Sequence, residues 1–359
     1  MRIALSTGGG DAPGLNAVIR AAVLSARTRG WDVLGIKRGY AGLMGDDDVI
    51  PMTADTVKGI GGLGGTILGT TNRGSPLAYP VRQADGTWIE VDRSDELIAN
   101  ARNLGIEALI SIGGDGSLKI ASQLAAKGMR IISVPKTIDN DVPGTVTTFG
   151  FDTAVNTAME AIDKLHTTAE SHDRVMVLEV MGREAGFIAL HAGVAGTADV
   201  ILIPEIAWDI EKVCEKIRAR DESGRRFSIV VVAEGAKPKG GKESIIGASL
   251  PGQERRLGGI AERLGFEIQK RTGKEVRSMV LGHLQRGGSP TGYDRLLATR
   301  FGAAAVQAVA DKQWGHMVAL QSPHLVCIPI DEVLRETKRV DPRHDVVQAA
   351  RMTGISFGD

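Results

Sequence analysis

Residues 108–117 read ALISIGGDGS, five strand-forming residues followed directly by a glycine-rich turn. A short apolar run of this kind is typical of a strand buried in a parallel sheet. Adjacent glycines let the chain turn sharply and bring backbone amides close to a ligand, because no Cβ stands in the way. The stretch therefore predicts a buried strand, a tight turn and then a helix.

The same alternation recurs along the chain. Further runs of buried-strand character lie at residues 3–7, 130–134, 175–180, 200–203, 228–233 and 278–282. Between them, stretches with apolar residues three and four positions apart predict amphipathic helices at 15–30, 152–165 and 210–220. Strands that alternate with helices predict an α/β fold with mainly parallel sheets and right-handed crossovers.

Composition excludes several classes of protein. The 359 residues include 43 Lys and Arg against 43 Asp and Glu, so no net charge attracts nucleic acid or an anionic membrane. Two cysteines, Cys214 and Cys327, cannot build a disulfide framework, which favours a reducing, cytoplasmic compartment. No apolar run approaches the roughly 18 residues of a membrane span, and the first strand is too short for a signal peptide. We expect a globular chain of one large domain or two.

Glycine is the unusual component of this sequence. The chain has 46 glycines, nearly twice the average share of about 7%. Four glycine-rich clusters follow predicted strands, namely GGGDAPG (8–14), GGDGS (113–117), MGREAG (181–186) and GHLQRGGSPTG (282–292). In open α/β sheets, ligands bind beyond the carboxyl ends of the strands. These turns therefore predict a binding site.

Two of the turns have the composition of phosphate-binding loops. In GGDGS, glycine amides at a helix N-terminus can approach an oligophosphate, and Asp115 can reach a phosphate-bound Mg²⁺. The GGGDAPGLN turn at 8–16 offers the same amides, with Asp11 close by. Taken alone, each turn fits equally well a tight strand-to-helix connection, capped in the first case by Asp115 or Ser117. Neither is a Walker A loop, because no GK[ST] follows.

A pair of carboxylates follows the strand at 130–134. In PKTIDNDVPGT (135–145), Asp139 and Asp141 are two positions apart, so in extended chain both side chains point the same way. One carboxylate could then deprotonate a substrate hydroxyl while the other faces a metal ion or orients its neighbour. The alternative is an Asx-turn before Pro143.

Basic residues occur singly in the glycine-rich turns rather than along helix faces. Guanidinium groups at strand ends suit phosphate esters, although each one alone also fits a solvated surface residue. Glu234, at the end of a strand, suits sugar hydroxyls or the capping of the next turn. The basic candidates are Arg73, Arg174, Arg183, Arg277, His283 and Arg286.

Together, and in this order, GGDAPGLN, GGDGS, TIDND, HDR, VMGR, AEG and GHLQRGGSP resemble the motifs of the 6-phosphofructokinase family, from about Ile3 to Arg300. The resemblance implies that the phosphoryl donor and Mg²⁺ are held by Gly9, Arg73, Gly114, Asp115, Gly116 and Ser117, with Asp115 on the metal. It implies that Asp139 is the general base, assisted by Arg73, Lys136 and Thr137. The implied fructose 6-phosphate site comprises Thr137, Asp139, Asp141, Met181, Gly182, Arg183, Glu234, His283 and Arg286.

The same resemblance implies the architecture. It predicts two Rossmann-like three-layer α/β/α domains with the active site in the cleft between them. The donor domain is expected at 1–150 plus about 285–335, and the fructose 6-phosphate domain at 151–284 plus about 336–359. Arg174 and Arg277 match arginines that reach the sugar phosphate from a neighbouring subunit, so we expect a homotetramer, with a dimer as the minimum.

The donor is where the sequence gives two indications. Pyrophosphate-using relatives typically have Asp at the position of Gly116 and Lys at that of Lys136, whereas the bacterial ATP enzymes have Gly at both. A carboxylate at 116 would repel the nucleotide α-phosphate, so Gly116 leaves room for ATP. We expect an ATP-dependent glycolytic kinase that makes fructose 1,6-bisphosphate, and pyrophosphate dependence is the alternative.

Two other functions are weaker alternatives. A non-catalytic sensor of sugar phosphates or nucleotides would be expected to lack a catalytic position, and Asp115, Thr137 and Asp139 are all present. Nicotinamide binding requires GxGxxG after the first strand, whereas that turn reads GGGDAPG.

Overall fold

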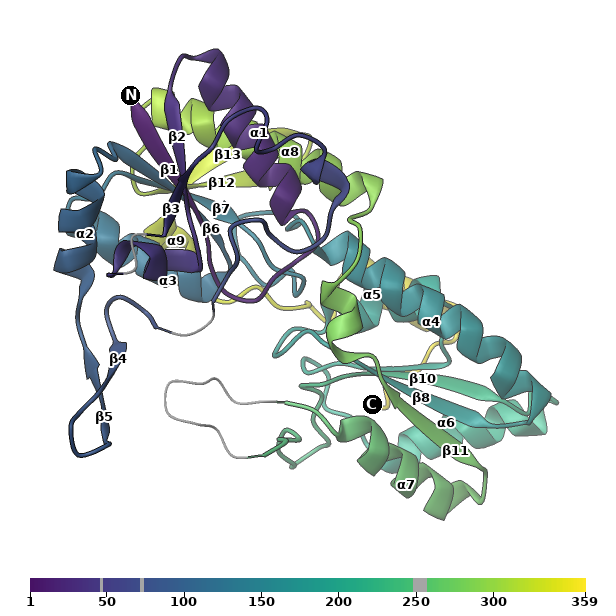
Figure 1. Ribbon diagram of the computed structural model, residues 1–359. Coiled ribbons are helices and arrows are strands. Elements are labelled where there is room, and N and C mark those ends of the chain that lie inside the picture. The colour runs from purple at the N-terminus through teal and green to yellow at the C-terminus, as the bar shows by residue number, and fades with distance from the viewer. Residues whose placement is uncertain (46–47, 72–73, 248–256) are drawn as a thin grey trace.

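The computed structural model describes residues 1–45, 48–71, 74–247 and 257–359. In that part of the chain, two large sheets form separate α/β layers, joined by segments that pass between them (Figure 1). A two-stranded hairpin of β4 (Tyr79–Arg82) and β5 (Trp88–Val91) extends away from the first sheet. The α/β class with mostly parallel strands is confirmed.

The first sheet has seven strands in the order β13-β12-β7-β6-β1-β2-β3. Its five central strands are parallel, and β3 and β13 pair antiparallel at the edges. The strands are β1 (Arg2–Thr7), β2 (Asp32–Ile36), β3 (Val49–Pro51), β6 (Ala108–Gly113), β7 (Ile131–Pro135), β12 (His316–Gln321) and β13 (His324–Pro329).

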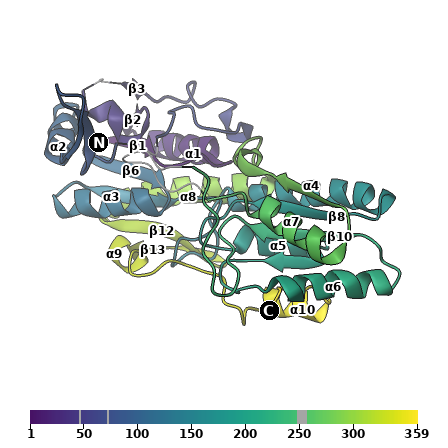
Figure 2. The ribbon, with the colours of Figure 1, turned by 90° about the horizontal axis from the view of Figure 1, so that it is seen from below.

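Helices cover both faces of this sheet because successive side chains of its strands point to opposite sides. Ile3 and Leu5 of β1 pack with α1 (Leu15–Thr28) and α8 (Gly292–Ala310). Ala4 packs on the other side with α2 (Ser94–Asn103), α3 (Asp115–Ala126) and α9 (Ile330–Val333). Figure 2 shows α2 and α3 together on one side and α1 and α8 together on the other. Short 3₁₀ helices lie at Gly39–Leu43 (η1), Ile60–Gly62 (η2) and Gly282–Arg286 (η3).

The second sheet has four parallel strands in the order β11-β8-β10-β9. These are β8 (Val175–Val180), β9 (Val200–Leu202), β10 (Ser228–Ala233) and β11 (Val276–Val280). One face packs against α4 (Phe151–Ser171), α5 (Phe187–Ala195) and α10 (Asp345–Met352), and the other against α6 (Ile210–Glu222) and α7 (Ile260–Thr272).

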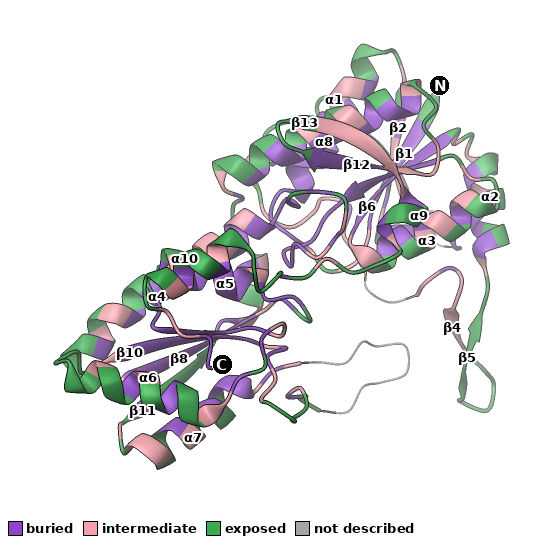
Figure 3. Cartoon of the chain, turned by 180° about the vertical axis from the view of Figure 1, so that it is seen from behind, coloured by how far each residue is buried: buried purple, intermediate pink, exposed green. Residues whose placement is uncertain are grey.

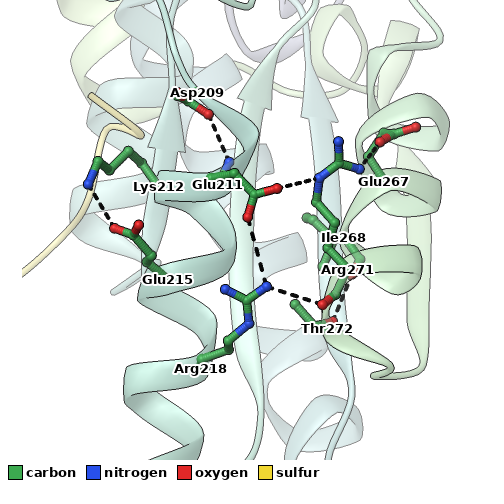
Figure 4. Close-up of polar contacts among 9 residues, drawn as sticks. All are labelled: Asp209, Glu211, Lys212, Glu215, Arg218, Glu267, Ile268, Arg271 and Thr272. Carbon is green, nitrogen blue, oxygen red and sulfur yellow. Dashed lines mark hydrogen bonds and ion pairs between the residues drawn. The ribbon is translucent and has the colours of Figure 1, made fainter.

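Burial separates the inner strands of the second sheet from its edge. β8 and β10 are buried along their whole length, whereas β11 is exposed from its second residue onward (Figure 3). On the outer face, charged side chains link α6 to α7. Arg271 pairs with Glu211 at 2.7 Å and also with Glu267, while Arg218 donates to the Arg271 carbonyl oxygen (Figure 4).

A buried carboxylate joins the two α/β units. Asp294 of α8 accepts hydrogen bonds from the Thr153 amide (2.8 Å) and hydroxyl (2.6 Å), which satisfies the first turn of α4. Burial raises the pKa of Asp294 to about 6. Beside it, Thr291 donates to Asp152 at 2.6 Å. The helix that opens the second unit is therefore held by the helix that returns the chain to the first.

The strands predicted at 3–7, 108–112, 175–180 and 228–233 are all present. The strand expected at 278–282 lies two residues earlier, because the glycine-rich segment after Val280 forms η3 instead. In the described part of the chain, no helix combines the length and apolar character needed to cross a membrane.

Candidate active site

Three glycine-rich or polar segments meet because β1, β6 and β7 are adjacent and parallel, so that their carboxyl ends share one edge. The Gly8 amide donates to the Ile112 carbonyl at 2.9 Å, which places the first turn against the second. At Gly113, a Cβ would lie 2.2 Å from Ser117 Oγ, so only glycine permits this close approach. Packing thus explains one glycine of the GGDGS turn without a ligand.

The N-terminus of α3 is open to a ligand. Gly114 caps the helix, and Asp115, Gly116 and Ser117 form its first turn, whose amides have no partner within the helix. A Cβ at Gly116 would meet no atom within 4 Å, so this glycine is not required by packing. Asp115 is half-exposed and pairs with Lys119 at 2.6 Å.

Lys136 lies between the first turn and the loop after β7. Its side chain is buried and its Nζ donates to the Gly10 carbonyl oxygen. Burial and the nearby Arg286 lower the pKa of Lys136 to about 8, although Asp139 and Asp141 oppose this shift. The residue is therefore a cation held close to the glycine amides and the carboxylates at once.

The two carboxylates lie close together, but not through the extended chain that the sequence predicts. The chain bends at Ile138 and Asp139, and Asn140 has a left-handed φ of 55°. The reason is a local hydrogen bond: the Asp139 amide donates to Thr137 Oγ1 at 3.1 Å, which turns the chain. The prediction of an extended chain between Asp139 and Asp141 was therefore wrong. The two carboxylates are nevertheless near each other, because the charge of Asp139 acts on Asp141.

Each carboxylate leaves one oxygen unused. Asp139 Oδ2 accepts from Thr137 Oγ1 at 3.3 Å, but Oδ1 of Asp139 and Oδ1 of Asp141 are buried without a hydrogen-bond partner among the described residues. Burial and then the Asp139 charge raise the pKa of Asp141 to about 6, while Arg183 opposes the shift. Buried acceptors of this kind are costly unless a ligand satisfies them.

The second sheet contributes the opposite wall. Gly182 and Arg183 follow β8, and Glu234 follows β10 and accepts the Arg183 amide at 3.0 Å. Burial raises the pKa of Glu234 to about 7, and the nearby charge of Asp139 adds to the shift. Met181 is half-buried against the core of the second sheet.

The segment after β11 reaches back to the first sheet. Arg286 of η3 donates from Nη1 to the Asp11 carbonyl oxygen at 3.0 Å, beside the first glycine turn. His283 of η3 is exposed. The predicted residues Gly9, Gly114, Asp115, Gly116, Ser117, Lys136, Thr137, Asp139, Asp141, Gly182, Arg183, Glu234 and Arg286 therefore gather between the two sheets.

Five predicted residues are not among them, namely Met181 and His283, whose positions are given above, and three arginines. Arg73 lies outside the described residues. Arg174 precedes β8, and Arg277 pairs with Met176 near the start of that strand. Both sit at the end of the sheet opposite Gly182, roughly 20 Å away for Arg277 and about 26 Å for Arg174 at about 3.3 Å per residue. Each also pairs with Glu275.

The sequence analysis did not identify Asn140 as the residue with the left-handed conformation. It also did not identify Lys338, whose Nζ donates to Asn140 Oδ1 at 3.1 Å. No motif marks Lys338, because it lies in a charged C-terminal segment far along the chain.

The side chains near the site restrict how a metal ion could bind. Among the described residues, no three His, Cys, Asp or Glu side chains converge on a point suited to a metal ion. Mg²⁺ commonly binds through one or two carboxylates together with water and substrate phosphates. Asp115, beside the open amides of α3, fits that mode.

Two mainly parallel sheets whose strand ends carry glycine amides, buried carboxylates and arginines are the arrangement of an α/β enzyme of the phosphotransferase class. The sequence model of the family described as Phosphofructokinase matches residues 2–309, and the chain belongs to that family. The resemblance stated from the motifs is therefore confirmed.

Individual relatives agree with this assignment. The ATP-dependent 6-phosphofructokinase of Chloroflexus aurantiacus is 54% identical over 358 residues, which cover 100% of this chain and 98% of that protein. The pyrophosphate--fructose 6-phosphate 1-phosphotransferase of Streptomyces coelicolor is 49% identical over 345 residues, covering 95% and 97%. The crystal structure of Pichia pastoris phosphofructokinase in the T-state is 31% identical with a TM-score of 0.80. The match covers 93% of this chain and 35% of the longer Pichia pastoris chain.

The raised pKa of Glu234 predicts a stability trend with pH. Because its folded pKa of about 7 exceeds the ordinary 4.5, the stability that Glu234 contributes is complete below about pH 4.5 and is lost as the pH rises through about 7. The Glu234→Gln variant does not titrate, so it should gain on the native chain between pH 5 and 8.5, by up to about 3 kcal/mol.

Urea unfolding of both chains at these pH values measures the trend, with Glu222→Gln on exposed α6 as the control substitution. A free-energy difference that stays constant or shrinks as the pH rises contradicts the assignment.

Proposed function

We propose that this chain transfers the γ-phosphoryl group of ATP to the 1-hydroxyl of fructose 6-phosphate, giving fructose 1,6-bisphosphate and ADP. One observation carries the proposal. The buried Asp139 carboxylate has one oxygen without a hydrogen-bond partner among the described residues, and Thr137 donates to its other oxygen. Thr137 also adjoins the N-terminus of α3, because a Cβ placed at the cap residue Gly114 would lie 3.8 Å from the Thr137 Cβ. A base and an anion site therefore adjoin. The names of the full-length relatives at 54% identity support the same activity.

On the donor side, the amides of Gly114, Gly116 and Ser117 would bind the phosphates, as helix N-termini commonly do. Gly9, whose amide donates to the Thr71 carbonyl at 3.0 Å, is assigned to the donor site by family resemblance. Asp115 would hold Mg²⁺, which when bound neutralises charge on the phosphates. Lys136 would stabilise negative charge that develops on the transferred group, since a preorganised cation in a buried site is effective there. Arg73, outside the described residues, is expected to assist.

On the acceptor side, Asp139 Oδ1 would take the proton of the sugar 1-hydroxyl, while Thr137 holds Oδ2 in place. Glu234 would accept hydrogen bonds from sugar hydroxyls. The remaining contacts to the sugar and its phosphate are assigned by family resemblance to Asp141, Met181, Gly182, Arg183, His283 and Arg286.

Pyrophosphate is the second candidate donor, and a specific observation favours each choice. Lys136 and the 49% identity to the Streptomyces coelicolor enzyme favour pyrophosphate. The open space around Gly116 favours ATP, because it leaves room for an α-phosphate. We choose ATP, because Lys136 does not hinder the binding of a nucleotide. A carboxylate at position 116 would hinder it, but this chain has Gly116.

The same family assignment divides the chain into a donor domain, 1–150 plus about 285–335, and a sugar domain, 151–284 plus about 336–359. Two features support this division. β12 and β13 extend the first sheet, and α10 packs on the second through α5.

The position of Arg174 and Arg277 supports an oligomer. At the far end of their own sheet they cannot reach the sugar bound by the same chain, so they would serve a neighbouring subunit's site. The exposed edge strand β11 supports a contact there, since Met279 is 46% and Val280 52% exposed. A tetramer in the cytoplasm, with a dimer as the minimum, is the form we propose.

Removing the base should abolish fast turnover. We predict that Asp139→Asn lowers kcat at least ~100-fold, within the usual range for a general base, with the KM for fructose 6-phosphate changed less than about threefold. A coupled ADP-release assay measures this, with Asp163→Asn on the exposed side of α4 as the control. Near-normal turnover of Asp139→Asn would sink the assignment.

The donor choice predicts a second variant. Gly116→Asp should leave the melting temperature unchanged, because its Cβ meets no atom within 4 Å. Its kcat/KM for ATP should fall about 100-fold through repulsion between like charges. Gly116→Ala is the matched control, and pyrophosphate turnover should not fall in parallel. Equal ATP kinetics in the Asp and Ala variants would refute the role given to Gly116.

Shared sites predict complementation between inactive chains. Asp139→Asn lacks the base and Arg277→Ala lacks the arginine lent to the neighbour, so each homo-oligomer should be nearly inactive. After equal amounts are unfolded and refolded together, one site of each mixed pair is intact, which should restore about a quarter of native activity. Activity no higher than the sum of the separate variants excludes sharing through Arg277.

A further inference from the structure

The C-terminal segment that follows α9 places a lysine against the loop after β7. Lys338 Nζ donates to Asn140 Oδ1 at 3.1 Å, to the Thr145 carbonyl at 3.1 Å and to the Val146 carbonyl at 2.7 Å. An ammonium has three N–H donors, so all of them are used. The Lys338 amide also donates to the Asp141 carbonyl at 3.1 Å. Backbone and side chain together bind the loop at four points.

This loop contains a backbone conformation that requires support. Asn140 has a left-handed φ of 55°, a conformation that costs a non-glycine residue free energy and requires support from its surroundings. Besides Lys338, Asn140 Oδ1 accepts only the Thr148 amide at 3.2 Å among the described residues. The conformation of Asn140 sets the direction in which the chain leaves Asp139. Lys338 therefore acts on the geometry of the carboxylate pair.

The surroundings of Lys338 favour a held cation. Nζ lies 5.2 Å from the centre of the Phe187 ring, which attracts a cation through its face. Burial lowers the pKa of Lys338 to about 8, and the charge of Asp141 opposes this shift by stabilising the ammonium. Loss of this charge would leave the Asp141 carboxylate with less compensation and three loop acceptors without their donor.

The next two residues connect the same segment to the second sheet. Arg339 pairs at 2.7 Å with Glu184, the residue that follows Arg183, and the Val340 amide donates to Glu205 at 2.9 Å. Glu205 in turn accepts the Gly186 amide at 3.0 Å. Residues 338–340 thus link the loop after β7 to the turn after β8.

We propose that Lys338 is a positioning residue for the phosphoryl transfer, in which its ammonium holds the 139–146 loop so that the Asp139 carboxylate faces the sugar hydroxyl. The proposal rests on the function proposed above for Asp139. It gives the charged C-terminal segment a part in catalysis through the loop that it holds.

The test is a double-mutant cycle on the full chain. Lys338→Met should lower kcat about 10- to 100-fold, since small misplacements of a catalytic group have effects of this size. Both KM values should change less than threefold. Lys338→Arg should recover most of the turnover, because a guanidinium still donates to the loop oxygens. In the Asp139→Asn background, Lys338→Met should have little further effect, because the group it positions is gone.

Arg343→Met, in the same segment but solvent-exposed, is the matched control and should behave as the native chain. If Lys338→Met fails to fold, Lys338→Gln removes the charge with a polar side chain that the buried loop carbonyls tolerate better. The proposal is overturned by turnover within threefold of native, by a loss confined to KM, or by an equal fold loss in the Asp139→Asn background.

The two proposals fail in different ways. If the native chain does not phosphorylate fructose 6-phosphate, or if Asp139→Asn turns over normally, the function assigned to Asp139 fails. If Asp139→Asn is inactive as expected but Lys338→Met is not impaired, only the role of Lys338 fails.

Discussion

The parallel register of β1, β6 and β7 is the constraint on which the site depends. Because these strands are hydrogen-bonded side by side with Thr7 opposite Ile112 and Gly113 opposite Pro135, their carboxyl ends reach the same edge. The two glycine turns and the carboxylate loop then meet without any direct sequence relationship. The second sheet repeats the arrangement, and the buried Asp294 contact joins the two units at the helices that connect them. Amides, carboxylates and arginines are thereby brought together.

A chain without net charge binds anions here by local means. Burial raises the pKa of Asp141 to about 6 and that of Glu234 to about 7, and lowers that of Lys136 to about 8. All three shifts have the same origin, since a low-dielectric site disfavours every charge that lacks a partner. Substrate phosphates and hydroxyls are such partners. The excess of glycine fits the same proposal, because amides at strand ends would bind phosphate without adding charge.

Much of this follows from sequence because the informative signals are local. Apolar runs ending in glycine predict the strands and the turns after them, and Asp139 belongs to a motif that the family resemblance interprets. The left-handed conformation of Asn140 could not be predicted, since it depends on Thr148 and on Lys338, 198 residues further along. The position of Arg277, at the end of its sheet away from Gly182, likewise becomes known only from the pairing of β11 with β8.

We propose that the strand-end amides and the space beside Gly116 admit a nucleoside triphosphate. Steady-state phosphorylation of fructose 6-phosphate by the native chain, measured with ATP and with pyrophosphate at equal Mg²⁺, tests this choice of donor. We expect turnover with ATP, with ADP and fructose 1,6-bisphosphate formed in equal amounts. Turnover with pyrophosphate alone would contradict the choice of ATP.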